Sequence, residues 1–234
     1  MIKVDVCLTP ELIHQHKLEG KIAVVVDIFR ATSCMVTGLA SGVKAIYPVA
    51  TVDECLALGQ EGMVTAGERG GQKIEEFDIG NSPFDYQRPE FVGREIAVST
   101  TNGTITIEKS KQAAEVLVGA FLNLQATAEY VLKRNLPVLI HCAGWKGTPN
   151  LEDTLYAGAL LEALAGHAEA EGDSAFLARS LFQQHRDNLL AAARQSGHAH
   201  RLAGFGITKD IDFCMQQNVF SLVARMEGNR LTSV

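Results

Sequence analysis

The residues best suited to chemistry follow two apolar runs of strand length. Residues 99–104, Ser-Thr-Thr-Asn-Gly-Thr, come after the apolar run 96–98 and lead into a helix-compatible stretch. Small hydroxyl, amide and glycine residues between a strand and a helix present backbone N–H groups and hydroxyls to an anion. Asp27 and Arg30 follow a second apolar run, 22–26, and place an acid and a base three residues apart. An anion cradle and an acid at strand ends together indicate chemistry on a phosphorylated small molecule.

Simpler interpretations apply to each signal alone. Asp27 is a suitable N-cap for the helix that follows it, and Asn102-Gly103 is common in ordinary turns. Glu68-Arg69 resembles a solvated surface pair, but the glycines at 67, 70 and 71 favour a backbone that approaches a ligand. Glu152-Asp153 precedes a helix and complements its dipole without a catalytic role. The functional interpretation therefore depends on these segments meeting in space.

Composition and charge limit the class of protein. Hydrophobic residues make up 47% of the chain and charged residues 21%, which is typical of a globular α/β protein. No stretch resembles a linker, so we expect one domain over residues 1–234. The net charge of −6 argues against a nucleic-acid partner. The apolar runs are far shorter than the roughly 20 residues of a membrane helix, so no membrane span is predicted. The strand-like start of the chain favours a cytoplasmic protein.

The alternation of apolar runs with helical spacing predicts the fold. Near-continuous apolar strands are buried on both faces, and helices between them imply right-handed parallel crossovers. We expect a three-layer α/β/α sandwich with a mainly parallel sheet, followed by a helical C-terminal portion, a subdomain at about 154–200. The strand candidates are Ile2–Leu8, Ile22–Val26, Ala45–Val49, Met63–Ala66, Ile96–Val98, Val116–Gly119, Val138–His141 and Val219–Arg225, and the helix candidates are Thr32–Ser41, Val52–Gln60, Thr104–Gln112, Leu124–Arg134, Thr154–His167 and Ser174–Gln195.

In such sheets, ligands bind beyond the carboxyl ends of the strands. The polar segments named above all follow strand candidates. The segment 70–94 has little periodicity and contains Asn81 and Ser82, and loops of this length inside a domain are usually functional. The histidines at 185, 198 and 200 lie in the polar helical region without metal-site spacing, so we expect them to be solvated.

The ordered set of motifs resembles a known family. Residues 24–33 (Val-Val-Val-Asp-Ile-Phe-Arg-Ala-Thr-Ser), 67–71 (Gly-Glu-Arg-Gly-Gly), 77–83 (Phe-Asp-Ile-Gly-Asn-Ser-Pro), 100–104, 142–144, 152–153 and 157–158 are similar to the successive motifs of the 2-phosphosulfolactate phosphatases. The resemblance covers the chain from Met1 to about Gly158, with Phe29 at a position where an aliphatic residue is expected. It implies a magnesium-dependent phosphatase that converts 2-phosphosulfolactate to sulfolactate and phosphate, on the route to coenzyme M in organisms that make it.

The residues and the resemblance together give a predicted site. Asp27 is a metal ligand or a nucleophile, Arg30 is a phosphate clamp, and Glu68 is a further oxygen ligand or a general base. Mg²⁺ suits carboxylates and leaves room for phosphate oxygens. The predicted site comprises the catalytic residues Asp27, Arg30 and Glu68, the substrate- and phosphate-binding residues Arg69, Asn81, Ser82, Thr100, Thr101, Asn102 and Gly103, and the metal ligands Asp27, Glu152 and Asp153.

Other functions remain open at this point. A haloacid-dehalogenase-type phosphatase has a second acid two residues after the first, and here that residue is Phe29. An isochorismatase-type cysteine hydrolase that uses Asp27 with Cys142 is the alternative enzyme, and a noncatalytic anion-binding protein is the alternative of another class. The expected partner is a small anionic phosphorylated substrate, with neither nucleic acid nor membrane, and a homo-oligomer remains open.

Overall fold

The apolar runs pair into one large sheet in a computed structural model of the protein, which describes residues 1–234. β2 illustrates the reason, because its five consecutive apolar residues are all buried, as a strand covered on both faces requires. The strands are β1 (Ile2–Cys7), β2 (Ile22–Val26), β3 (Ala45–Pro48), β4 (Val64–Arg69), β5 (Gln72–Lys73), β6 (Glu95–Ser99), β7 (Glu115–Gly119), β8 (Val138–Cys142), β9 (Ala168–Glu171), β10 (Ala224–Glu227) and β11 (Arg230–Ser233).

Two groups of parallel strands make up the sheet, and the C-terminal hairpin joins them. The strand order is β5-β4-β6-β3-β11-β10-β7-β2-β8-β1-β9. β4, β6 and β3 run parallel to one another, and so do β7, β2, β8, β1 and β9. Between the groups, β11 is antiparallel to β3, and β10 is antiparallel to both β11 and β7. The predicted α/β fold with a mainly parallel sheet is confirmed.

Because the hairpin pairs antiparallel with β3 and with β7, the strands of one parallel group run in the opposite direction to those of the other. In twisted sheets neighbouring strands are rotated by about 20–25° on average, and a rotation of this size over the five steps from β6 to β2 offsets the reversal. The loops that follow β2, β4 and β6 therefore meet, and hydrogen bonds join them directly.

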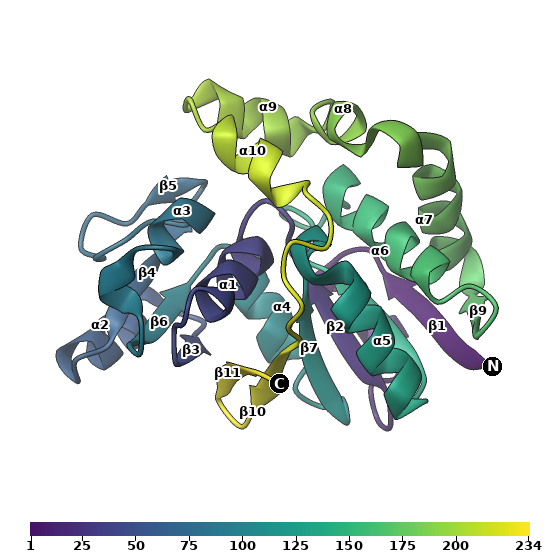
Figure 1. The fold of residues 1–234 in the computed structure, drawn as a ribbon, viewed down its shortest axis with the longest axis horizontal. Coiled ribbons are helices and arrows are strands. Elements are labelled where there is room, and N and C mark those ends of the chain that lie inside the picture. Colours follow the sequence, from purple (N-terminus) through teal and green to yellow (C-terminus); the bar gives the residue numbers. More distant parts are fainter.

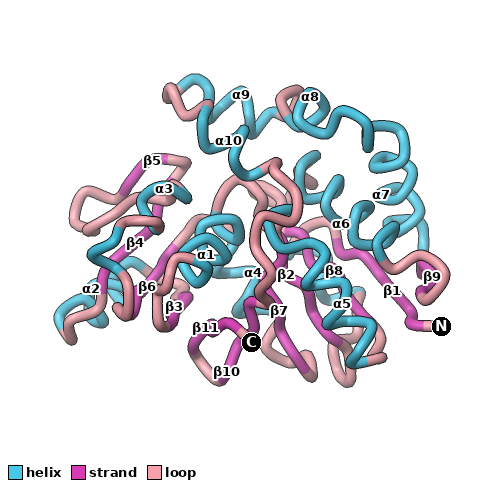
Figure 2. The backbone as a smooth tube through the Cα atoms, in the orientation of Figure 1, coloured by secondary structure: helices cyan, strands magenta, loops and turns pink.

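Helices cover both faces of the sheet (Figures 1 and 2). They are α1 (Ala31–Ala40), α2 (Val52–Gln60), α3 (Pro83–Tyr86), α4 (Gly103–Lys109), α5 (Leu124–Arg134), α6 (Leu151–Ala163), α7 (Gly172–His185), α8 (Leu189–Ala193), α9 (Gly197–Gly204) and α10 (Lys209–Cys214). α1 is buried over nearly its whole length because it packs against strands of both parallel groups and against the hairpin. α4 lies behind the sheet in the view of Figure 1.

The C-terminal helices pass over the loops that follow the strands. In Figure 1, α7 to α10 form an arch along the top of the molecule, in green to yellow. α7 packs on α6 and β1, and α10 packs on α3, so this arch reaches from one parallel group to the other. The arch brings residues of α9 and α10 to the ends of β2 and β4.

The C-terminal third departs most from the sequence-based expectations. The helix expected at Ser174–Gln195 is interrupted at Arg186–Asn188, and α9 and α10 were not expected. The strand predicted at Val219–Arg225 is wrong in its bounds, because β10 begins at Ala224 and pairs with β11 through a turn at Gly228, whose φ is 65°. α8, α9, α10, β10 and β11 have only four to eight residues each, which is too short for a clear periodic signal.

The two halves of the sheet share one core. A single cluster of sixty buried apolar residues extends from β1 to β11. None of the helices has both the length and the apolar character that crossing a membrane would require.

Candidate active site

Asp27 stands between β2 and α1, with its main chain fixed by Thr32. The Asp27 N–H donates to the Thr32 hydroxyl at 3.0 Å, and the Asp27 carbonyl accepts from the Thr32 hydroxyl and N–H. Only 8% of Asp27 is exposed, and burial raises the pKa of its carboxyl to about 6. Glu68 and Glu152 raise this pKa further, whereas His198 opposes them. A cation beside Asp27 would therefore strongly stabilise the ionised form of its carboxyl.

Glu68, on β4, is held by three donors. Its Oε1 accepts from the Thr101 N–H at 2.7 Å, and its Oε2 accepts from the Gly71 N–H at 2.6 Å and from the Thr101 hydroxyl at 3.2 Å. These bonds tie the β4–β5 hairpin to the turn that follows β6. Both Thr101 donors, which were predicted to face phosphate, are directed at Glu68 instead.

The turn between β6 and α4 retains two uncommitted amide donors. The Thr100 hydroxyl accepts from the Thr104 N–H at 3.1 Å, and the Thr100 N–H donates to the Thr104 hydroxyl at 3.2 Å. The N–H groups of Asn102 and Gly103 donate to no protein acceptor. Of the four residues predicted to cradle phosphate, Asn102 and Gly103 are therefore the two whose N–H groups are free to bind an anion.

A small cavity, here called the inner cavity, brings these segments together. Asp27, Glu68, Asn102, Arg30 and Asn81 line it, together with Phe29, Gly71, Trp145, His198 and Leu202. Its volume of about 10 Å³ holds one water molecule at most. Five of the predicted site residues, from four separate segments, thus meet at one point.

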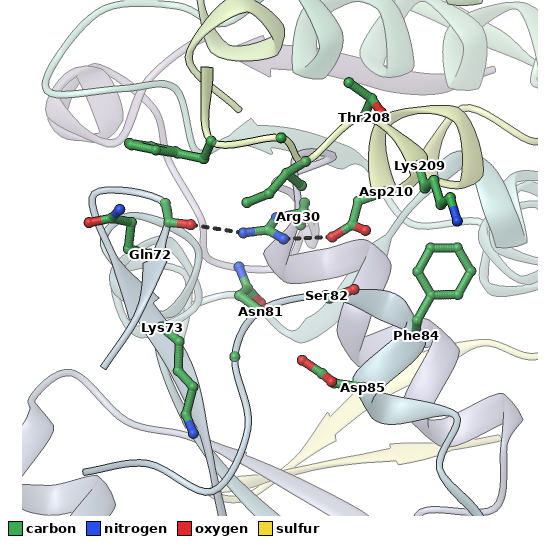
Figure 3. A pocket seen from close by; sticks show the side chains of 15 residues that line it. Arg30, Gln72, Lys73, Asn81, Ser82, Phe84, Asp85, Thr208, Lys209 and Asp210 are labelled. Atoms are coloured by element: carbon green, nitrogen blue, oxygen red, sulfur yellow. Dashed lines mark hydrogen bonds and ion pairs between the residues drawn. The ribbon is translucent and has the colours of Figure 1, made fainter. Parts of the chain in front are cut away.

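A larger cleft of about 520 Å³, here called the outer cleft, adjoins the inner cavity and shares Arg30, Gly71 and Asn81 with it. Figure 3 shows Arg30 at its centre, with Asn81 and Ser82 on the segment below. Arg30 Nη1 donates to Asp210 Oδ2 at 2.6 Å, and Nη2 donates to the Gly71 carbonyl at 3.1 Å. Because Arg30 lines both spaces, it forms the boundary between them. The Phe29–Arg30 peptide bond is cis.

The predicted binding residues Arg69, Asn81 and Ser82 do not all meet. Arg69 lines neither the inner cavity nor the outer cleft. Its guanidinium donates to the Glu68 carbonyl and to the Ser99 hydroxyl, both at 2.8 Å. Asn81 is buried, and its Oδ1 has no hydrogen-bond partner.

Glu152 and Asp153 open α6 and lie outside the lining of the inner cavity. Asp153 Oδ1 accepts from the Ile28 N–H at 2.9 Å and Oδ2 accepts from the Gly144 N–H at 3.1 Å, so this carboxyl fastens the loops after β2 and β8 to each other. Burial, with Glu152 and Asp27, raises the pKa of Asp153 well above its ordinary value. Of the three predicted metal ligands, only Asp27 lines the inner cavity.

His198 was expected to be solvated, and this expectation is wrong. Only 8% of it is exposed, and its Nδ1 lies 2.8 Å from Glu152 Oε1. Its ring packs edge-on against Phe29, with 6.0 Å between the ring centres, and lies beside Trp145, with 5.9 Å between the ring centres. Arg201, three residues further along α9, stacks on Trp145 with its Cζ 3.9 Å from the ring centre. A prediction of α9 as a helix would have placed His198 and Arg201 on one face.

Cys142, the alternative nucleophile, is fully buried at the end of β8. Burial raises the pKa of its thiol well above the ordinary value, and Asp153 adds to this effect. A thiol in this state is inert, because the thiolate is the nucleophile. The cysteine-hydrolase alternative therefore lacks its reactive group.

The oxygen groups that line the inner cavity are of the kind that magnesium prefers. No group of three or more His, Cys, Asp or Glu side chains lies close enough together to hold a metal alone. Magnesium is commonly bound through one or two carboxylates plus phosphate oxygens and water. The Asp27 and Glu68 carboxylates and the unpartnered Asn81 Oδ1 are hard oxygen groups on the same cavity.

Comparison with known proteins assigns the family. The family model of 2-phosphosulpholactate phosphatase matches residues 7–229 of the chain. The chain belongs to this family. Members from Thermotoga petrophila and Thermotoga maritima, each named a probable 2-phosphosulfolactate phosphatase, are 39% identical over 220 residues, 94% of this chain and 93% of theirs. A member of the same name from Caldanaerobacter subterraneus is 37% identical over 221 residues, 92% of each chain. The enzyme class of the family is that of a phosphatase.

Proposed function

We propose that the protein hydrolyses 2-phosphosulfolactate to sulfolactate and inorganic phosphate, with magnesium as its cofactor. The observation that carries this proposal is the meeting of Asp27, Glu68, Arg30 and Asn102 at the inner cavity. Gly103 lies directly against the Asp27 carboxylate. The names of the family and of its relatives supply the substrate.

Asp27 is the residue proposed to hold the magnesium ion. Burial and two neighbouring acids raise the pKa of Asp27 to about 6, so a divalent cation relieves an unfavourable charge there. Glu68 and the Asn81 amide oxygen are the further oxygen groups of the same cavity. When bound, magnesium neutralises charge on the phosphate oxygens and polarises them.

The remaining groups act on the charge that develops during hydrolysis. Water attacks phosphorus, the bond from phosphorus to the ester oxygen breaks, and the departing oxygen ends with the proton that the water loses. During this step negative charge spreads over the leaving and equatorial oxygens. In this proposal the Arg30 guanidinium and the N–H groups of Asn102 and Gly103 stabilise that charge. Glu68 is held by three donors and therefore stays fixed while the substrate reacts.

Asp27 is assigned as a ligand rather than as the nucleophile. Position 29, two residues further on, is the buried aromatic Phe29, so the second acid that accompanies an aspartyl nucleophile in haloacid dehalogenases is absent here. Acid quenching of the enzyme during turnover of substrate labelled in the phosphate tests this role. No label should remain on the protein, and label that hydroxylamine releases would assign Asp27 as the nucleophile.

A phosphate-release panel tests the proposed function. The purified protein is assayed with 2-phosphosulfolactate, with other 2-phospho-2-hydroxy acids and with glycerol 2-phosphate, first in a chelator and then with added magnesium. We expect the highest kcat/KM for 2-phosphosulfolactate, weaker release from the related acids, and no turnover in the chelator. Unchanged activity in the chelator would remove magnesium from the proposal, and binding of all these compounds without release would indicate the anion-binding alternative.

A further inference from the structure

The proposed phosphate clamp, Arg30, is itself held by a residue distant in the sequence. Asp210 lies on α10, 180 residues after Arg30, and its Oδ2 accepts from Arg30 Nη1 at 2.6 Å. We infer that Asp210 is a positioning residue, which fixes the Arg30 guanidinium in the orientation that binds the phosphate group. This inference rests on the proposed function.

The hydrogen bond between Arg30 and Asp210 ends a series of hydrogen bonds that crosses the site. Thr101 donates to Glu68, and Glu68 accepts from the Gly71 N–H. The carbonyl of Gly71 accepts from Arg30 Nη2 at 3.1 Å, and Arg30 Nη1 donates to Asp210. Figure 3 shows the last two bonds on opposite sides of the Arg30 guanidinium. The position of this group is therefore fixed from the β4–β5 hairpin and from α10 at once.

The location of the pair points to a role in binding rather than in packing alone. Arg30 is 5% exposed and lines both the inner cavity and the outer cleft, so an anion in the outer cleft meets its guanidinium at the entrance to the inner cavity. A guanidinium has five N–H donors in a rigid fork, and two of these five are engaged by Asp210 and Gly71. A fork fixed in this way binds a phosphate with little further loss of side-chain entropy.

The C-terminal arch of helices also helps to fix the Arg30 guanidinium. Because Asp210 lies on α10, the orientation of Arg30 depends on the docking of a segment outside the motifs of the strand ends. Leu202 and Phe205 in the same arch lie beside Gly71, within 3.4 to 3.6 Å of the place a Cβ on that glycine would take. The arch thus supplies one of the two groups that the Arg30 guanidinium touches, Asp210, and lies beside the other, Gly71.

Two variants of Asp210 separate positioning from the other roles. In Asp210→Asn, the side-chain amide oxygen still accepts from Arg30 although the charge is lost, whereas Asp210→Ala removes the acceptor. Asp212→Asn is the matched control, since Asp212 lies on the same helix, has a side chain that is 46% exposed, and pairs with Arg194. Inorganic phosphate is the probe, titrated by calorimetry with magnesium present, and the melting temperature of each variant is measured in parallel.

We expect Asp210→Ala to raise the Kd for phosphate by about 10-fold or more, as the loss of one charge-assisted hydrogen bond implies. The Kd of Asp210→Asn should stay within about 3-fold of the wild-type Kd, and the Kd of Asp212→Asn should equal the wild-type value. If Asp210→Ala does not fold, Asp210→Gln, which displaces the acceptor by one methylene, should show the same weakening.

Three results would overturn the inference. Tighter phosphate binding by both Asp210 variants would mean that Asp210 occupies the place of the anion. Lower melting temperatures with an unchanged Kd would mean that the pair only stabilises the fold. No phosphate binding by the wild type would remove Arg30 as a clamp. A wild type that binds phosphate through Arg30 but does not hydrolyse 2-phosphosulfolactate would contradict the proposed function and leave the role of Asp210 intact.

Discussion

Gly103 lies directly against the carboxylate of Asp27. A Cβ at position 103 would stand 2.8 Å from Asp27 Oδ2 and 2.6 Å from the Cβ of Ala31. The turn that opens α4 and the turn that opens α1 are therefore in contact, and only a residue without a side chain fits between them. This contact places the uncommitted N–H groups of Asn102 and Gly103 beside the acid proposed to hold the metal.

Gly103→Ala should lower both stability and activity. The added methyl group forces α4 away from Asp27, and overpacking of this kind costs about 1–3 kcal/mol in the free energy of unfolding. Urea denaturation and the kcat/KM for phosphate release measure the two effects. The matched control is Gly197→Ala, because Gly197 also begins a helix and has nothing within 4 Å of an added Cβ. Equal stability of the two variants would contradict the close contact.

Asp27→Asn should change how stability depends on pH. Burial raises the pKa of Asp27 from 3.8 to about 6, so between these values the native state keeps a proton that the unfolded state has lost. Stability contributed by this group is therefore present below pH 3.8 and is lost as the pH rises towards 6. We measure the free energy of unfolding of both proteins in a chelator. Between pH 4 and pH 7 the value for the variant should rise relative to that for the wild type by on the order of 2 kcal/mol. A difference that is independent of pH would show that Asp27 ionises normally.

His198→Ala should destabilise the protein far more than His200→Ala. Glu152 is fully buried, its Oε2 has no partner, and His198 is the residue that pairs with its Oε1 at 2.8 Å. Leaving a buried carboxylate without its partner costs about 3–5 kcal/mol. His200 is exposed on the same helix, so its replacement should change stability by less than about 0.5 kcal/mol. Thermal melts compare the two, and equal shifts would refute the importance of the pair.

Strand-end residues were predictable because the strands that precede them are continuously apolar. The runs that form β2 and β6 place Asp27 and the 100–103 turn at strand ends without any tertiary information. Arg69 shows where this reasoning fails. It adjoins Glu68 within β4, and successive side chains of a strand point to opposite faces. Glu68 is therefore buried beside the inner cavity while Arg69 is exposed.

The C-terminal contributions to the site could not be read from local patterns. α9 and α10 are short, and the pairing of Arg30 with Asp210 joins residues that only the arch of helices brings together. The reversal between the two parallel groups depends in the same way on where the hairpin of β10 and β11 inserts, which a local pattern does not encode. Short elements have weak periodicity, and their positions are decided by tertiary packing.

One side-by-side assay tests whether a phosphatase site is built around Asp27. Initial rates of phosphate release from 2-phosphosulfolactate are measured with magnesium for the wild type, Asp27→Asn and Cys142→Ala, each shown to be folded by circular dichroism. We expect phosphate release by the wild type and by Cys142→Ala, and a loss of most turnover in Asp27→Asn. Near-normal turnover in Asp27→Asn, or a loss of turnover in Cys142→Ala, would show that the site is not built around Asp27.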